Sequence, residues 1–425
     1  MTYRDAARVW WRIGWLSFGG PTAQIALMHR LVVEERGWLQ ESEYLGALGF
    51  CMLLPGPEAM QLATYAGWRL HGVRGGLTAG TLFVLPGAVV VFAISAFYAA
   101  LAHLPLVLAA FQGIRATALI LVVEALIRLG PRALNTARDT WIAAGAFAAL
   151  FCFAIPFPVV ILAAAIAGVA TGGRPGAPFA KPPADAALPL AHMARTALLW
   201  TVVWTLPLLV IAAVFGRAHV LTQLAWFFSE LAVVTFGGAY AVLAYMSQAI
   251  VQHHGWLTAP QMLDGLGLAE TTPGPLILVT EFVGFLAGKQ AGLTPAVLYA
   301  TLGAAVALWA TFVPCFLWVF TGAPLISRLE QWPRVRQALG GITAAVLGVI
   351  AQLTLWFAIH LWFTQVGAWR TGVVQMTAPV WASLDMRAVA LTALSALLLL
   401  RLRWSLHRVL VSAAAASLLW TLLRG

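Results

Sequence analysis

Long apolar segments separated by short polar stretches run along the whole chain. About 20 apolar residues form one membrane-spanning helix, and fewer suffice where Pro or Gly interrupts a segment. By this measure the pattern predicts thirteen segments, at residues 8–33, 44–71, 77–102, 107–129, 140–155, 157–171, 195–215, 222–251, 262–288, 294–323, 337–363, 386–400 and 404–423. The short pairs 140–155/157–171 and 386–400/404–423 are candidates for hairpins that cross only in part. The pattern therefore predicts an all-α polytopic membrane protein.

Composition supports this prediction and excludes several classes of protein. Of the 425 residues, 61% are hydrophobic and 9% are charged, against about 25% charged in soluble domains. The net charge of +10 comes from Arg residues scattered between apolar segments. We interpret them as topology anchors and expect no nucleic-acid partner. Because no metal-ligand spacing, nucleotide-binding loop or nucleophile motif occurs, we expect no metal, no cofactor and no enzyme activity.

The distribution of basic residues predicts an orientation. With a cytoplasmic N-terminus, seventeen Lys and Arg residues fall in inside loops and seven in outside loops. This bias favours a cytoplasmic N-terminus and a periplasmic C-terminus. One polar stretch rich in Pro and Gly, residues 172–189, is typical of an interdomain linker.

The two halves of the chain are related by a tandem duplication. When the sequence is aligned with itself at one constant shift in residue number, which we call the first offset, three motifs of the first half meet similar motifs of the second half. Phe18-Gly19-Gly20 aligns with Phe236-Gly237-Gly238, Gly37-Trp38-Leu39 with Gly255-Trp256-Leu257, and Pro55-Gly56-Pro57 with Pro273-Gly274-Pro275. A slightly larger shift, called the second offset, aligns Pro86 with Pro314, Pro105 with Pro333, and Gly113-Ile114 with Gly341-Ile342. We therefore predict a first repeat (1–172), a linker with a connecting helix (173–218) and a second repeat (219–425). An odd number of crossings between equivalent points predicts an inverted repeat, as in secondary transporters.

Each repeat contains two Gly/Pro breaks inside apolar segments. They lie at Gly19-Gly20-Pro21, Pro55-Gly56-Pro57, Gly237-Gly238 and Pro273-Gly274-Pro275. Pro interrupts a helix, and an open backbone at membrane depth must face protein or a water-filled cavity. New helices starting at Pro57 and Pro275 would direct free N–H groups at an anion. The alternative is that Gly-Gly only permits close packing and Pro only bends the helix.

Together these motifs resemble the chromate ion transporter (CHR) family in its long, two-domain form. The resemblance rests on Phe18-Gly19-Gly20-Pro21, the run Leu54 to Tyr65, Phe236-Gly237-Gly238-Ala239-Tyr240, and the run Leu266 to Pro275. It implies export of chromate from the cytoplasm across the bacterial inner membrane, with sulfate as a chemically similar ion. Met60 and Glu281 depart from the family pattern, where we expect Gln at both positions.

Polar residues beside the breaks are the candidate binding residues. Glu58, Gln61 and Tyr65 share one helical face. The carboxylate of Glu58 either caps its own helix or takes up and releases a proton as the substrate binds and leaves. Thr271 and Thr272 could donate hydroxyls to an oxyanion or bond the previous turn. The full candidate set is Gly19, Gly20, Gln24, Pro55, Gly56, Pro57, Glu58, Gln61, Tyr65, Arg115, Gly237, Gly238, Tyr240, Glu270, Thr271, Thr272, Pro273, Gly274 and Pro275.

Arg115 is the basic residue that topology explains least. A guanidinium group matches the paired oxygens of a tetrahedral oxyanion, so we place it among the binding residues. Glu124 lies out of phase with Arg115 but four residues before Arg128, which predicts a structural ion pair between Glu124 and Arg128.

The leading hypothesis is therefore a secondary active transporter for chromate, coupled to protons. A transporter for sulfate or another oxyanion is the alternative within this class, and an anion channel is the alternative outside it. Membrane lipids surround the protein, and assembly as a homodimer is left open.

Overall fold

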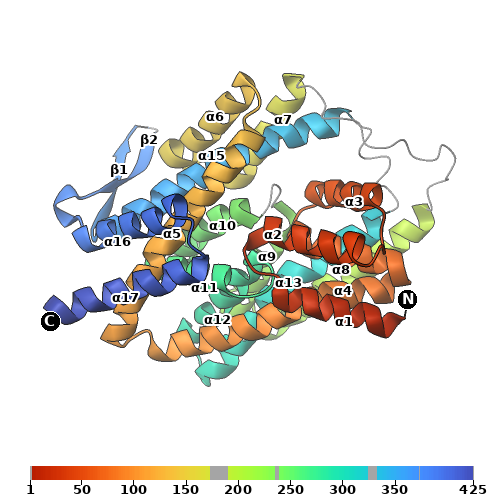
Figure 1. The fold of residues 1–425 in the computed structure, drawn as a ribbon, viewed down its shortest axis with the longest axis horizontal. Helices are drawn as coiled ribbons and strands as arrows, with labels where there is room; N and C mark the ends of the chain where they lie inside the picture. Colours follow the sequence, from red (N-terminus) through yellow and green to blue (C-terminus); the bar gives the residue numbers. More distant parts are fainter. Residues whose placement is uncertain (1, 173–189, 235–238, 324–332, 373, 425) are drawn as a thin grey trace. The chain divides into compact units, whose positions relative to one another are not determined.

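The computed structural model describes residues 2–172, 190–234, 239–323, 333–372 and 374–424, and most of them are helical (Figure 1). The first half forms α1 (Tyr3–Leu16), α2 (Gly20–His29), the π-helix η1 (Arg30–Glu34), α3 (Glu41–Leu53), α4 (Glu58–Leu101), α5 (Pro105–Ala133), α6 (Ala137–Phe153), α7 (Phe157–Ala170) and α8 (Leu190–Phe215). The second half forms α9 (Val220–Val234), α10 (Ala239–Gln248), η2 (Ala249–His254), α11 (Ala259–Thr271), η3 (Leu276–Leu278), α12 (Val279–Gln290), α13 (Ala296–Gly322), α15 (Pro333–Trp362), β1 (Val366–Thr371), β2 (Val374–Pro379), η5 (Trp381–Ser383), α16 (Met386–Ala396), η6 (Leu397–Arg401) and α17 (Leu406–Arg424).

Six of these helices are long and apolar enough to cross a membrane: α4, α5, α8, α13, α15 and α17. The prediction of an all-α polytopic membrane protein is confirmed. Other predicted segments are divided into helices whose length is less than the thickness of a bilayer. Segment 8–33 becomes α1, α2 and η1, and segment 262–288 becomes α11, η3 and α12. These divisions fall at the Gly and Pro residues, because Pro cannot donate an intrahelical hydrogen bond.

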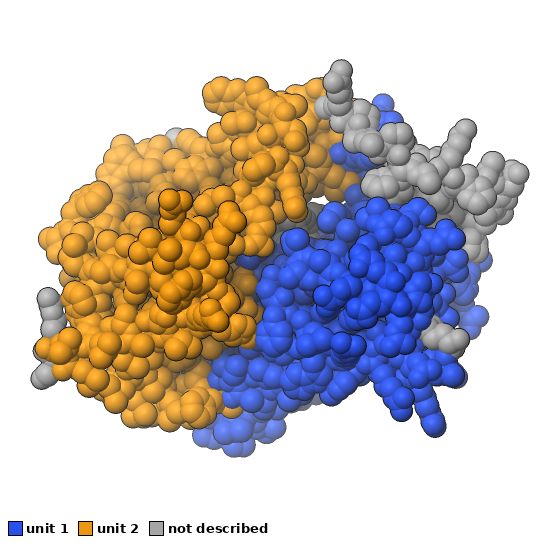
Figure 2. All heavy atoms as spheres, in the orientation of Figure 1, with its two compact units in different colours: residues 1–95, 174–242, 272–336 blue, residues 96–173, 243–271, 337–425 orange. Residues whose placement is uncertain are grey.

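The chain forms two compact units, which Figure 2 shows in different colours. The first unit comprises residues 1–95, 174–242 and 272–336. The second unit comprises residues 96–173, 243–271 and 337–425. Each unit therefore combines segments from both halves of the sequence, and neither unit is a single repeat.

Two helical hairpins of the same design lie in the first unit. Helix α4 reverses at His71 and Gly72, whose backbone angles are not helical, so that Gly67 packs against Gly75. Helices α12 and α13 pack in the same way through Gly284 and Gly303. The second offset between the repeats relates Gly75 to Gly303, so the two hairpins use an equivalent glycine. The absence of side chains at these positions lets the two backbones touch.

In the second unit, α5 packs against α11, α16 and α17. Gly113 of α5 lies directly against the backbone of Ala413 in α17. Thr117 and Ser395 share a hydrogen bond of 3.1 Å between α5 and α16. Helix α15 makes similar close contacts, because Gly348 lies against the carbonyl group of Ala143 in α6. Small residues thus set the spacing of helices in this unit as well.

One feature that the apolar pattern did not predict is a two-stranded antiparallel sheet between α15 and α16. Strand β1 pairs with β2, with Val366 opposite Pro379 and Thr371 opposite Val374. A side-chain alternation along such short strands is a much weaker signal in sequence than a long apolar helix. The hairpin is therefore a local addition to a helical protein.

The contact between α12 and α13 generates a prediction about stability. In Gly303→Ala the new Cβ would overlap the carbonyl oxygen of Gly284, which is backbone and cannot move aside, so we expect a loss of about 1–3 kcal/mol. The matched control is Gly145→Ala in α6, where a Cβ meets nothing within 4 Å and the better helix former adds up to about 1 kcal/mol. Thermal unfolding of the purified protein in detergent measures both, and equal midpoints for the two variants would contradict the prediction.

Candidate functional site

The first predicted break separates α1 from α2 in the first unit. Helix α1 ends at Leu16, and α2 begins at Gly20 with Pro21 in its first turn. No side chain caps the N-terminus of α2 at Gly19. The buried Ser17 hydroxyl donates to the carbonyl of Ile13 over 2.6 Å. The N–H groups of the first turn of α2 are therefore not occupied by a capping side chain.

The break at Pro55-Gly56-Pro57 lies between α3 and α4. Gly56 has a φ of 107°, a region that residues with a side chain rarely adopt. Buried Gln61 turns back and donates from Nε2 to the carbonyl of Pro55 over 2.6 Å. A Cβ at Gly56 would lie 3.3 Å from Sγ of Cys315 in α13. The break is thus held between its own helix and a helix of the other repeat.

The break at Pro273-Gly274-Pro275 directly contacts residues on both sides of the Gly19-Gly20-Pro21 break. The backbone N–H of Gly274 donates to the carbonyl of Ser17 over 2.9 Å. Nε2 of Gln24 in α2 donates to the carbonyl of Gly274 over 2.7 Å. After this break the chain forms the 3-10 helix η3 before α12, so α12 begins at Val279, four residues after the predicted start at Pro275.

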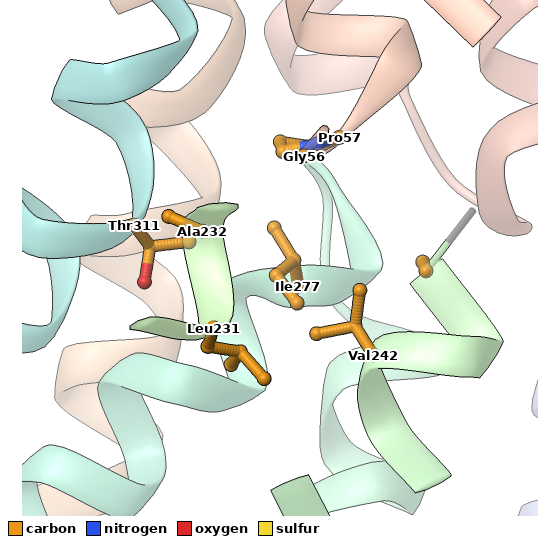
Figure 3. A pocket seen from close by; sticks show the side chains of 8 residues that line it. Gly56, Pro57, Leu231, Ala232, Val242, Ile277 and Thr311 are labelled. Carbon is orange, nitrogen blue, oxygen red and sulfur yellow. The ribbon is translucent and has the colours of Figure 1, made fainter. Parts of the chain in front are cut away.

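The residues before α4 and the short helix η3 lie close to α10 in this unit. A Cβ at Gly20 would lie 4.0 Å from the hydroxyl of Tyr240 in α10. A small cavity is lined by Gly56 and Pro57 before α4, by Ala239 and Val242 of α10, and by Ile277 of η3 (Figure 3). Helix N-termini carry partial positive charge and free N–H groups. The arrangement can therefore stabilise an anion without a basic side chain.

The polar residues of α4 differ in their surroundings. Glu58 is half-buried at the first position of α4. Gln61 and Tyr65 are buried further along the same helix. The position of Glu58 in the first turn of α4 fits both interpretations, a helix cap and a proton-exchanging group. Gln61 uses its amide N–H to hold the break, while its Oε1 has no hydrogen-bond partner among the described residues.

Arg115 belongs to the second unit and is held by a carboxylate that the sequence analysis did not single out. Its Nε and Nη2 donate to Oδ1 and Oδ2 of Asp264, both over 2.7 Å. The hydroxyl of Tyr98 donates to the same carboxylate over 2.8 Å. Asp264 is completely buried. Two of the three guanidinium nitrogens are therefore committed to a protein carboxylate.

The remaining candidates are divided between the units. Glu270 is buried in the second unit, and Thr271 donates to the carbonyl of Leu268 over 2.8 Å, the bond to the previous turn that was one of its two expected roles. Thr272 and the following Pro-Gly-Pro belong to the first unit. Gly237 and Gly238 lie outside the described residues. The predicted ion pair between Glu124 and Arg128 is confirmed.

Two buried acidic groups outside the candidate set have a recognisable sequence signal. Asp264 and Glu281 lie inside the predicted segment 262–288, and both are at most 2% exposed. An ionisable residue at membrane depth is a functional candidate by default. Oε2 of Glu281 has no hydrogen-bond partner among the described residues. Within the same described part of the chain, no group of three His, Cys, Asp or Glu residues could hold a metal ion.

Comparisons with known proteins agree on one family. The family described as "Chromate transporter" matches residues 4–169 and 222–420. A probable chromate transport protein of Synechococcus elongatus is 30% identical over 342 residues, 80% of each chain. Chromate transport proteins of Pseudomonas aeruginosa and Cupriavidus metallidurans are 32% and 28% identical, over 84% and 82% of this chain and 81% of each relative. No solved structure matches the chain.

The ion pair of Arg115 generates a prediction. Asp264→Asn removes the negative charge and leaves the guanidinium buried without compensation, so we expect a loss of about 3–5 kcal/mol. The double variant Asp264→Asn with Arg115→Gln removes both charges and should recover part of that stability. Thermal unfolding of the single and double variants in detergent measures the coupling. Strictly additive losses would show that the pair contributes no interaction energy.

Proposed function

Because the chain belongs to the chromate transporter family, we propose that it is a secondary active transporter that exports chromate from the cytoplasm, coupled to protons. Chromate is a tetrahedral oxyanion that carries two negative charges near neutral pH. Three relatives, each aligned with the chain over at least 80% of its own length, are named as chromate transport proteins, one of them as probable. The protein would act in the bacterial inner membrane.

The observation that carries this proposal is the convergence of helix N-termini in the first unit. Gly20 and Gly56 each stand at or just before the start of a helix, and both lie close to residues of α10. Backbone N–H groups recognise the charge and shape of an oxyanion rather than its central atom. Sulfate, which has the same shape and charge, is therefore the second candidate substrate.

The repeat architecture supports a transporter rather than a channel. We place the N-terminus in the cytoplasm and the C-terminus in the periplasm, on the excess of basic residues in the inside loops. An odd number of crossings then inverts the second repeat relative to the first. Inverted repeats with broken helices at the binding site suit alternating access, in which one group of helices moves against another.

The direct test uses inside-out vesicles that contain the protein, with a pH gradient imposed across the membrane. We expect labelled chromate to accumulate in these vesicles well above protein-free vesicles, and unlabelled sulfate to compete if the site does not distinguish the central atom. Accumulation of sulfate but not chromate would assign the alternative oxyanion. Large chromate currents under voltage clamp, far above transporter turnover, would show an anion channel.

Coupling is assigned to Glu58, the carboxyl group at the start of α4. A bound anion about 4 Å from a carboxylate repels it by roughly 4 kcal/mol per unit charge at an effective dielectric of about 20, so binding of the anion drives uptake of a proton by Glu58. Glu58→Gln cannot titrate. We expect chromate exchange at equal pH to persist in this variant, while accumulation driven by the gradient falls at least tenfold.

The matched control for this variant is Glu124→Gln, which changes a carboxylate already paired with Arg128. It should keep accumulation driven by the pH gradient near the wild-type level. If Glu58→Gln responds fully to the gradient, Glu58 is only a helix cap, and Glu270 or Glu281 becomes the group to test.

A further inference from the structure

The start of α3 and the end of the first half of α4 meet in the first unit. Nε of Arg69 donates to Oε1 of Glu43, in the first turn of α3, over 2.5 Å. Gly56 stands thirteen residues after Glu43 and thirteen before Arg69, so the break lies at the closed end of a helical hairpin. Each arm reaches about 20 Å at a rise of about 1.5 Å per residue, whereas the hydrocarbon core of a bilayer is about 30 Å thick. This hairpin is therefore too short to cross a bilayer, and its two ends lie together.

Helix α1 lies beside the second half of α4, which begins after the reversal at Gly72. Tyr3 in the first turn of α1 shares a hydrogen bond with Thr78. Further along, a Cβ at Gly14 would overlap the carbonyl oxygen of Leu82. Helix α1 has 14 residues, which gives it a length of about 21 Å. It therefore starts beside the reversal of α4 and ends within the thickness of a bilayer.

Helix α2 then returns toward the start of α3. Nε2 of His29, the last residue of α2, lies 2.6 Å from Oε2 of Glu41, the first residue of α3. The hydroxyl of Tyr44 donates to the carbonyl of Ile25 over 2.7 Å. The C-terminus of α2 is thus next to the end of α3 that carries Glu43.

A further contact joins these ends to the start of α1. Arg69 stands two residues before His71, at the reversal of α4, and the ring centroids of His71 and Tyr3 lie 5.6 Å apart. The start of α1, the end of α2, the start of α3 and the reversal of α4 therefore lie at one end of the unit. The breaks at Gly19-Gly20-Pro21 and Pro55-Gly56-Pro57 lie about 20 Å along the helices from this end, one in each hairpin.

The basic residues of the chain support this arrangement. If the segments 8–33 and 44–71 both cross the membrane, the loop between them lies outside and contributes Arg30 and Arg36 to the seven outside residues. If both segments return, the loop lies on the side of the N-terminus, and the counts change from seventeen inside and seven outside to nineteen and five. The stronger bias toward one side favours returning segments.

The second repeat has a related contact in the same unit. The ring centroid of His219, which precedes α9, lies 5.6 Å from that of Tyr299 in the first turn of α13. The second offset relates Tyr299 to His71, and the first offset relates Leu221, two residues after His219, to Tyr3. The start of α9 therefore lies beside the start of α13, as the start of α1 lies beside the reversal of α4.

We propose that α1 with α2, and α3 with the first half of α4, are two re-entrant hairpins that enter the membrane from the cytoplasmic face and return to it. Each hairpin carries one Gly/Pro break into the membrane interior. Through the duplication, the related segments of the second repeat enter from the periplasmic face. Each repeat then has two crossings fewer, so the number of crossings between equivalent points stays odd and the repeats stay inverted. Both breaks of the first repeat belong to hairpins that start at the cytoplasm, the side from which an exporter takes up its substrate.

Labelling of single cysteines with a membrane-impermeant maleimide tests both sets of hairpins. The first offset makes Gln40 and Thr258 equivalent, and both residues are exposed. We expect Gln40→Cys to react at least tenfold faster in inside-out vesicles than in spheroplasts, and Thr258→Cys to show the opposite preference. If all of these segments crossed the membrane, the two preferences would be exchanged.

Two exposed positions outside the hairpin loops serve as matched controls. Both arrangements place Thr2→Cys in the cytoplasm and Ala291→Cys in the periplasm. The unsubstituted chain gives the background, since Cys51 and Cys315 are buried.

The controls make each outcome decisive. Reaction of Gln40→Cys from the same side as Ala291→Cys would overturn the hairpins of the first repeat, and reaction of Thr258→Cys from the same side as Thr2→Cys would overturn those of the second. Reaction of Thr2→Cys and Gln40→Cys together from the periplasmic side would confirm the hairpins and overturn their entry from the cytoplasm.

A second measurement tests whether the two arms of one hairpin meet. In the double variant Glu43→Cys with Arg69→Cys, we expect a short bis-maleimide to join the two thiols, which mass spectrometry of the digested protein detects. A segment that crosses would hold these positions about 30 Å apart on opposite faces, and absence of the joined product would overturn the hairpin. Glu43→Cys with Ala291→Cys is the matched control and should give no joined product. Neither measurement requires transport, so a failure of the proposed function leaves both results unchanged.

Discussion

The need to satisfy open backbone groups inside an apolar protein determines how the first unit is built. A helix break exposes N–H and C=O groups that hydrocarbon cannot satisfy. At Gly274 both backbone groups have partners. The N–H donates to the carbonyl of Ser17, which follows α1, and the carbonyl accepts a hydrogen bond from the side chain of Gln24 in α2. Each break must therefore lie against another element. The close packing of the breaks against other helices follows from this requirement.

The positions of the breaks could be predicted from the sequence because Gly and Pro act locally. Gly56 and Pro57 end one helix and begin another whatever surrounds them. The reversal of α4 at His71 and Gly72 likewise falls at the end of the predicted segment 44–71, before the next segment begins at residue 77. The β-hairpin after α15 was not predicted, since short strands without a long apolar period leave a weak signal. Local chemistry thus accounts for the helices and their ends.

The partners of individual side chains could not be predicted in the same way. Arg115 was placed among the oxyanion-binding residues, which stays a prediction, and no sequence signal pointed to its partner Asp264, a residue 149 positions away. Its charge and isolation were visible, but its partner depends on how α5 packs against α11. Gln61 was predicted to share a helical face with Glu58 and Tyr65, but its hydrogen bond to the carbonyl of Pro55 could not be predicted. Both outcomes reflect the same rule, that a buried polar group takes the nearest available partner.

Duplication produces two related breaks, at Pro55-Gly56-Pro57 and at Pro273-Gly274-Pro275. A neutral amide satisfies a backbone carbonyl at each break without adding charge, because Gln61 donates to the carbonyl of Pro55 and Gln24 donates to the carbonyl of Gly274. The pair of Arg115 and Asp264 is by contrast unsymmetrical, since the related positions are Thr343 and Gly46. Single substitutions after duplication can thus give equivalent positions of the two repeats different partners, while the breaks themselves keep the same kind of support.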